Sequence, residues 1–222
     1  MNLNVLIILP FLTAMFILFS KDLKQIRMVA FMGAALQLVL GGFLLYVYCD
    51  ARSAGDTSQF LFEQSFAWYP SLNINYHIGV DGISIAMILL TASVVLAGVL
   101  VSWNESRMSK EFFLLLTFLA LGAYGFFISL DLFTLFFFLE LAVIPKYLLI
   151  GIWGSGKKEY SAMKLALMLM GGSALVLVGI LGVYFYGGNS FDLVSVSQNF
   201  IPIEMQRIFL SLIHISEPTR PY

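Results

Sequence analysis

The stretch LFTLFFFLELAVIPKYLLIGIW, residues 132–153, decides the fold. Its only charged side chains are Glu140 and Lys146. A helix of this length extends about 33 Å at 1.5 Å per residue, and the hydrocarbon core of a bilayer is roughly 30 Å thick. The stretch therefore predicts a membrane-spanning α-helix.

Five further apolar stretches are long enough to cross a membrane. With the first, they predict an all-α fold, a polytopic transmembrane helix bundle of six complete spans at about residues 3–20, 28–48, 83–103, 112–130, 132–153 and 162–186. Residues 205–213 predict the start of a seventh span. No positive charge precedes the first stretch and no cleavage site follows it, so we expect it to remain in the mature protein.

The last residues differ from the rest of the chain. Two prolines, an acid and an arginine follow residue 213, and they cannot continue a helix through lipid. We interpret residues 1–210 as the transmembrane unit and residues 211–222 as a polar tail foreign to that fold. The alternative is a genuine polar C-terminal tail.

Composition excludes several functions. Of the 222 residues, 60% are hydrophobic and 11% are charged, whereas soluble chains average about 25% charged. The 12 Lys and Arg do not exceed the 13 Asp and Glu, so a nucleic-acid partner is not expected. The single cysteine, Cys49, excludes an internal disulfide, a cysteine-based zinc site and an iron–sulfur cluster held by this chain alone.

Loop charges predict the orientation, because basic residues concentrate on the cytoplasmic side. The first, third and fifth loops carry seven cations, whereas the opposite loops carry only Arg52 before Arg207. The N-terminus is thus expected outside. The cytoplasmic cations are Lys21, Lys24, Arg27, Arg107, Lys110, Lys157 and Lys158.

The outer loop before the third span is polar and aromatic. Alternation in residues 71–77 suggests a short hairpin, and Asp81 is expected to cap the third span. We expect His77 to be solvated, and neither His77 nor His214 has a second ligand for a metal or haem.

Glu140 is the strongest candidate functional residue. It follows Asp131 by nine positions, about 13 Å along a helix, which places it near the midplane. A carboxyl group in this position can change its charge state when one neighbouring charge moves, as a proton carrier must. Pro145 should bend the helix near Leu141 and free a carbonyl. The alternative is a purely structural partner for a lysine on another helix.

Lys146 and Lys164 are the other ionisable residues expected in the hydrocarbon. Lys164 starts the sixth span and could instead extend to the headgroups. Lys146 lies about 120° around the helix from Glu140, so spacing alone does not pair them.

Three motifs together resemble subunit M of respiratory complex I, called subunit 4 in mitochondria. They are FFFLELAVIPKYLLIGIWG at residues 136–154, GVDGIS at 79–84 and YSAMK at 160–164. The resemblance implies an antiporter-like proton channel subunit, in which Glu140 matches the glutamate of the proton pathway and Lys164 a recurring lysine. Lys146 departs from the family, which more often has an apolar residue there.

The resemblance also implies the function. It predicts a membrane-arm subunit of NADH–quinone oxidoreductase in a bacterial inner membrane, translocating protons beside other membrane-arm subunits. NADH, FMN, iron–sulfur clusters and quinone are expected on partner subunits, with no cofactor or metal on this chain. The alternatives are a subunit of a multisubunit sodium/proton antiporter and a structural scaffold.

Overall fold

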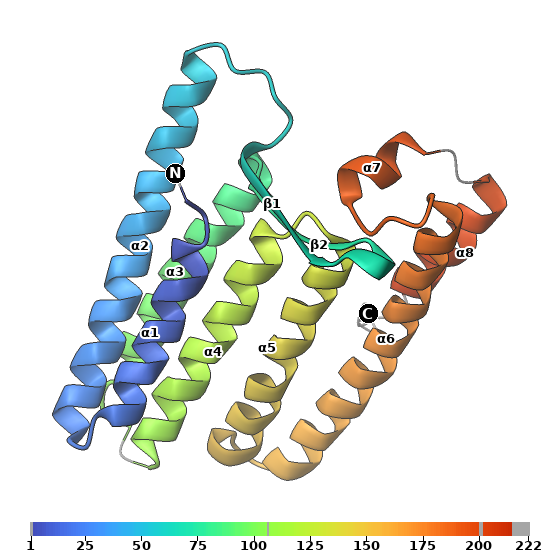
Figure 1. The fold of residues 1–222 in the computed structure, drawn as a ribbon. Helices are drawn as coiled ribbons and strands as arrows, with labels where there is room; N and C mark the ends of the chain where they lie inside the picture. The colour runs from blue at the N-terminus through green and yellow to red at the C-terminus, as the bar shows by residue number, and fades with distance from the viewer. Residues whose placement is uncertain (1, 106, 200–201, 215–222) are drawn as a thin grey trace, which may run out of the picture.

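The computed structural model describes residues 2–105, 107–199 and 202–214, which form a bundle of long helices with a β-hairpin across one end (Figure 1). In chain order the elements are α1 (Val5–Phe19), α2 (Leu23–Ser53), β1 (Leu61–Tyr69), a 3-10 turn (Pro70–Leu72), β2 (Ile74–Val80), α3 (Gly82–Val101), α4 (Ser109–Ile128), α5 (Leu132–Trp153), α6 (Lys158–Tyr186), α7 (Leu193–Gln198) and α8 (Ile203–His214).

Five helices are long and apolar enough to cross a membrane, namely α2 to α6. The predicted fifth span coincides with α5, whereas α2 extends beyond its predicted bounds at both ends. The predicted first span is the 15-residue apolar helix α1, shorter than a crossing helix usually is. The mostly helical transmembrane fold is confirmed, and the number of six spans plus a seventh stays a prediction.

The predicted seventh span begins in α8, a 12-residue helix that contacts α6. Of the tail predicted at residues 211–222, positions 211–214 belong to this helix. Residues 215–222 lie outside the described part of the chain, so the interpretation of the tail stays a prediction.

Helices α1 to α4 pack against one another, and α5 and α6 follow on the side of α4 (Figure 1). The contact between α4 and α5 is close because α4 presents glycine there. A Cβ added to Gly122 would lie 2.9 Å from Ala142 Cβ. Small residues allow such an approach where no hydrophobic effect drives helices together.

The basic loops meet at one end of the bundle. Lys110 Nζ donates to Leu18 O over 2.6 Å, Arg27 donates to Glu105 O, and Trp153 Nε1 donates to Arg107 O. These bonds join the loops after α1, α3 and α5, so the prediction that the three loops share one side is confirmed.

The hairpin crosses the opposite end (Figure 1). Strand β1 pairs antiparallel with β2, and Leu130 N, after α4, donates to His77 O over 2.8 Å. A hairpin was predicted, but its extent was wrong, because residues 71–77 contain only the turn and part of β2. Residues 65–69 of β1 are exposed on both faces of the strand. No face of this part is buried, so no alternation of apolar and polar residues is required there, and the strand could not be predicted from such a pattern.

Candidate functional site

Glu140 lies in the middle of α5, surrounded by apolar side chains of the same helix. Its residue is half-buried, and its Oε1 is shielded from solvent without a hydrogen bond to any described residue. A buried carboxyl oxygen without a partner costs free energy. The Oε1 atom of Glu140 is therefore available to bind a cation or a proton inside the apolar part of the bundle.

The face of α5 that carries Glu140 is partly open. Phe137 and Ile144 lie about 60° and 40° from Glu140 around the helix, and their exposed fractions are 46% and 63%. The opposite face, with Phe138 and Ala142, is buried against α4. A partner for Glu140 would thus approach from the side of Phe137 and Ile144, since α4 covers the opposite face and α6 also contacts α5.

The two predicted lysines are not brought to Glu140. Lys146 is half-buried on α5, and Lys164 is exposed on α6 in a stripe with Tyr160 and Leu167. Within residues 2–105, 107–199 and 202–214, none of the three charged groups forms an ion pair. The proton-pathway roles of Glu140, Lys146 and Lys164 stay predictions.

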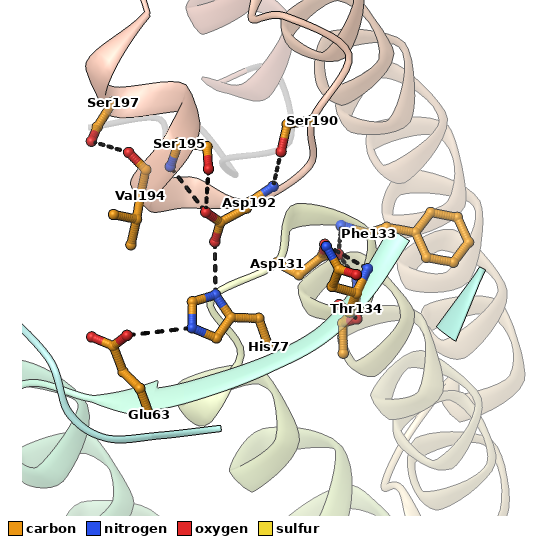
Figure 2. Close-up of polar contacts among 11 residues, drawn as sticks. Glu63, His77, Asp131, Phe133, Thr134, Ser190, Asp192, Val194, Ser195 and Ser197 are labelled. Carbon is orange, nitrogen blue, oxygen red and sulfur yellow. Dashed lines mark hydrogen bonds and ion pairs between the residues drawn. The ribbon is translucent and has the colours of Figure 1, made fainter. Parts of the chain in front are cut away.

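A polar cluster, formed by Asp131, His77 and Asp192, lies beside the hairpin at the start of α5 (Figure 2). Asp131 is fully buried and caps this helix: its Oδ1 accepts from Phe133 N and Thr134 N at 3.0 Å, and its Oδ2 accepts from Asn75 N at 3.4 Å. Asp131 therefore fixes the entry of α5 to strand β2. Asp81 caps α3 in the same way, accepting from Ser84 N at 2.7 Å, as predicted.

His77 joins this group to the segment after α6 (Figure 2). Its Nδ1 lies 2.7 Å from Asp192 Oδ1, and its Nε2 lies 3.6 Å from Glu63 Oε2. Because an ionised carboxylate only accepts hydrogen bonds, the Nδ1 atom carries a proton. The prediction that His77 is solvated was wrong, since its side chain is 13% exposed and lies between two acids.

The surroundings shift the pKa values of both aspartates. Burial raises the pKa of Asp131 above its ordinary value, despite three backbone N–H groups that oppose this effect. Burial also acts to raise the pKa of Asp192, but hydrogen bonds from Ser195 and His77 outweigh it and lower that pKa. The cluster thus holds an ionised Asp192 beside the His77 ring.

Sequence reasoning did not find this cluster. Asp131 and Asp192 each precede a helix and so carry the signal of an N-cap. Nothing in the sequence pairs His77 with Asp192, which lies 115 positions away. Although Glu63, His77 and Asp192 lie in one row, no group of three acids, histidines or cysteines arranged to hold a metal ion is found within the described residues.

Comparisons with known proteins agree with this architecture. Residues 129–216 match the family described as NADH:quinone oxidoreductase/Mrp antiporter, transmembrane. NAD(P)H-quinone oxidoreductase chain 4-2 of Synechocystis sp. is 32% identical over 207 residues, covering 92% of this chain and 36% of that relative.

Solved structures share the fold. A chain of respiratory complex I from Thermus thermophilus with bound NADH superposes with a TM-score of 0.78 at 21% identity, covering 96% of this chain and 43% of its own. A chain of the Mrp complex from a Dietzia species gives a TM-score of 0.75 at 17% identity, with 96% and 22% covered.

The chain spans little more than a third of the length of the curated relatives it matches. Its apolar helices make it an integral membrane subunit. The sequence match over most of the chain and the shared fold lead to one assignment. The chain belongs to the family of antiporter-like membrane subunits found in NADH:quinone oxidoreductases and Mrp antiporters.

Proposed function

We propose that the chain is part of a membrane-arm subunit of NADH–quinone oxidoreductase and that Glu140 carries protons in it. The observation that carries the proposal is the Oε1 of Glu140, buried without a hydrogen bond to a described residue, on the partly open face of α5. Buried ionisable groups in membrane helices are costly and usually serve transport.

The redox chemistry belongs to other subunits in this proposal. NADH, FMN, iron–sulfur clusters and quinone bind partner subunits, and the membrane-arm neighbours contact this chain through its exposed helix faces. Its relatives include NAD(P)H-quinone oxidoreductase chain 4 of Synechocystis sp., which supports this assignment over the alternatives. The orientation follows from the basic loops, with the N-terminus outside a bacterial inner membrane.

The mechanism depends on the distance between Glu140 and a cation. When a lysine lies close, the carboxylate is stabilised in its charged form, and when the lysine moves away a proton binds instead. Lys146, half-buried six positions along α5, is the nearest cation in sequence and would influence this equilibrium. Lys164 would act from α6, at the edge of the membrane.

The test is Glu140→Gln in the complete assembled complex, reconstituted in vesicles. We expect NADH-driven proton uptake to fall by about tenfold or more, because the amide cannot carry the proton. Glu159→Gln is the matched control, since Glu159 is an exposed acid in the first turn of α6. Full pumping by Glu140→Gln would overturn the proposal.

Lys146→Met and Lys164→Met test the two lysines. Each should lower proton uptake per NADH oxidised while the complex still assembles. A variant that pumps like the wild type would remove that lysine from the pathway.

A sodium/proton antiporter is the second candidate, because the fold is shared with a chain of the Mrp complex. Sodium-dependent proton exchange without NADH oxidation, in vesicles holding the complete native assembly, would favour it. A scaffold would behave differently again: Glu140→Gln would lower the amount of assembled complex and leave pumping per complex unchanged.

A further inference from the structure

A proline and a glutamine form a joint between α1 and α2. Pro10 lies inside α1 and has no N–H, so the carbonyl of Leu6, one turn earlier, loses its helical donor. Gln37 of α2 supplies a donor in its place, since its Nε2 lies 3.0 Å from Leu6 O. Leu6 and Gln37 are both buried, with exposed fractions of 0% and 3%. The Nε2 atom of Gln37 therefore bonds α2 to α1.

Gln37 also lines a small cavity among α1, α2, α3 and α4. Gln37 Oε1 is buried without a hydrogen bond to a described residue, and so is the hydroxyl of Tyr124 on α4, whose exposed fraction is 1%. Both side chains line the cavity. The remaining lining includes Thr13, Ala34, Thr117 and Ala120.

The cavity has the size of one water molecule. About 20 Å³ is open to the centre of a water-sized sphere, and one buried water needs roughly 10–15 Å³ by this measure. Its chemistry also fits water, because a carbonyl oxygen needs a donor and a phenol needs an acceptor. Water supplies both at once.

Two threonines complete the set of partners. Thr13 and Thr117 donate their hydroxyl protons to Leu9 O and Phe113 O in their own helices, at 2.8 Å each. Their oxygens keep acceptor capacity for a second water proton. A neutral occupant is favoured over a sodium ion, because no acidic side chain lines the cavity to balance the charge and a buried charge without a partner is costly.

We propose that this cavity binds one structural water, which donates to Gln37 Oε1 and accepts from the Tyr124 hydroxyl. The water links the α1–α2 joint to α4 inside the membrane. The site is separate from the proposed proton pathway. Gly122 of α4 packs on α5, which carries Glu140, whereas Tyr124, about 200° away on α4, faces the cavity.

Radiolytic hydroxyl labelling of the complete assembled complex in ¹⁸O water tests the site, because a bound water generates radicals beside its neighbours. Phe113 is the reference. It is a fully buried aromatic residue of α4 that does not line the cavity. We expect Tyr124 to be labelled at least about tenfold faster than Phe113, since a buried water is a local source of label.

Ala34→Val should fill the cavity and lower Tyr124 labelling to the Phe113 rate. Ala92→Val is the matched control, because Ala92 is 1% exposed in the hydrophobic cluster that contains Tyr124 but does not line the cavity. Equal labelling of Tyr124 and Phe113 in the wild type would overturn the proposal, and this result does not depend on the variant folding. Labelling that persists in an assembled Ala34→Val complex would also overturn it.

Discussion

Replacing Asp131 by alanine should open the start of α5 far more often than in the wild type. The substitution removes acceptors for Phe133 N, Thr134 N and Asn75 N, at a fully buried position. Loss of an N-cap costs about 0.5–2 kcal/mol, and a buried N–H group left unpaired costs about 1–3 kcal/mol. Since the bond to Asn75 is long, we expect a total of about 3 kcal/mol, or roughly 100-fold in the opening equilibrium.

Hydrogen exchange of residues 129–136, followed by mass spectrometry on the assembled complex in nanodiscs, measures this opening. Asp131→Asn keeps an oxygen that can accept the two capping bonds. The protection of residues 129–136 in this variant should therefore stay within about threefold of the wild type. Asp81→Ala is a second control. That half-buried cap accepts a single bond, and its loss should cost about 1 kcal/mol in α3. Unchanged protection of residues 129–136 in Asp131→Ala would refute the assignment of Asp131 as the residue that fixes α5.

Three further predictions concern the same end of the bundle and the α4–α5 contact. The hydrogen-exchange protection of residues 129–136 should rise as the pH falls from 7 toward 3.8, the ordinary pKa of Asp131. The reason is that the folded state, in which this pKa is raised, binds the proton more tightly than the unfolded state. Asp131→Asn should not show this rise at the same pH. His77→Phe removes the bond to Asp192 and should speed exchange in residues 190–197 by about tenfold, the equivalent of a charge-assisted hydrogen bond; an unchanged rate would show that the Ser195 bonds alone hold the segment. Gly122→Val should reduce assembly by overpacking against α5, at a cost of about 1–3 kcal/mol, whereas Gly171→Ala, where an added Cβ meets open space, should assemble normally.

The spans could be predicted because lipid imposes a one-dimensional rule on the sequence. A helix that crosses the hydrocarbon needs a long apolar run, so the bounds of α5 follow from composition alone. The same rule identified Glu140, since an acid is conspicuous in such a run. The rule is weaker at the ends, because α2 continues to Ser53 through Asp50 and Arg52, and a search for apolar runs stops before such charged residues.

The polar cluster could not be predicted in this way, because no local sequence pattern indicates which of its residues meet. His77 lies in β2, and Asp131 and Asp192 are the N-caps of α5 and α7; the cluster forms only because the tertiary structure brings these three segments together. Leu132 N donates to Phe191 O and Leu193 N donates to Leu130 O, so the backbone itself joins the start of α5 to the start of α7. Because this join fixes the start of α5, Glu140 has a defined position in the bundle, and the exposed side chains of Phe137 and Ile144 leave the helix partly open beside it. A proton-carrying glutamate needs both properties, and the first of them originates in residues outside the apolar span.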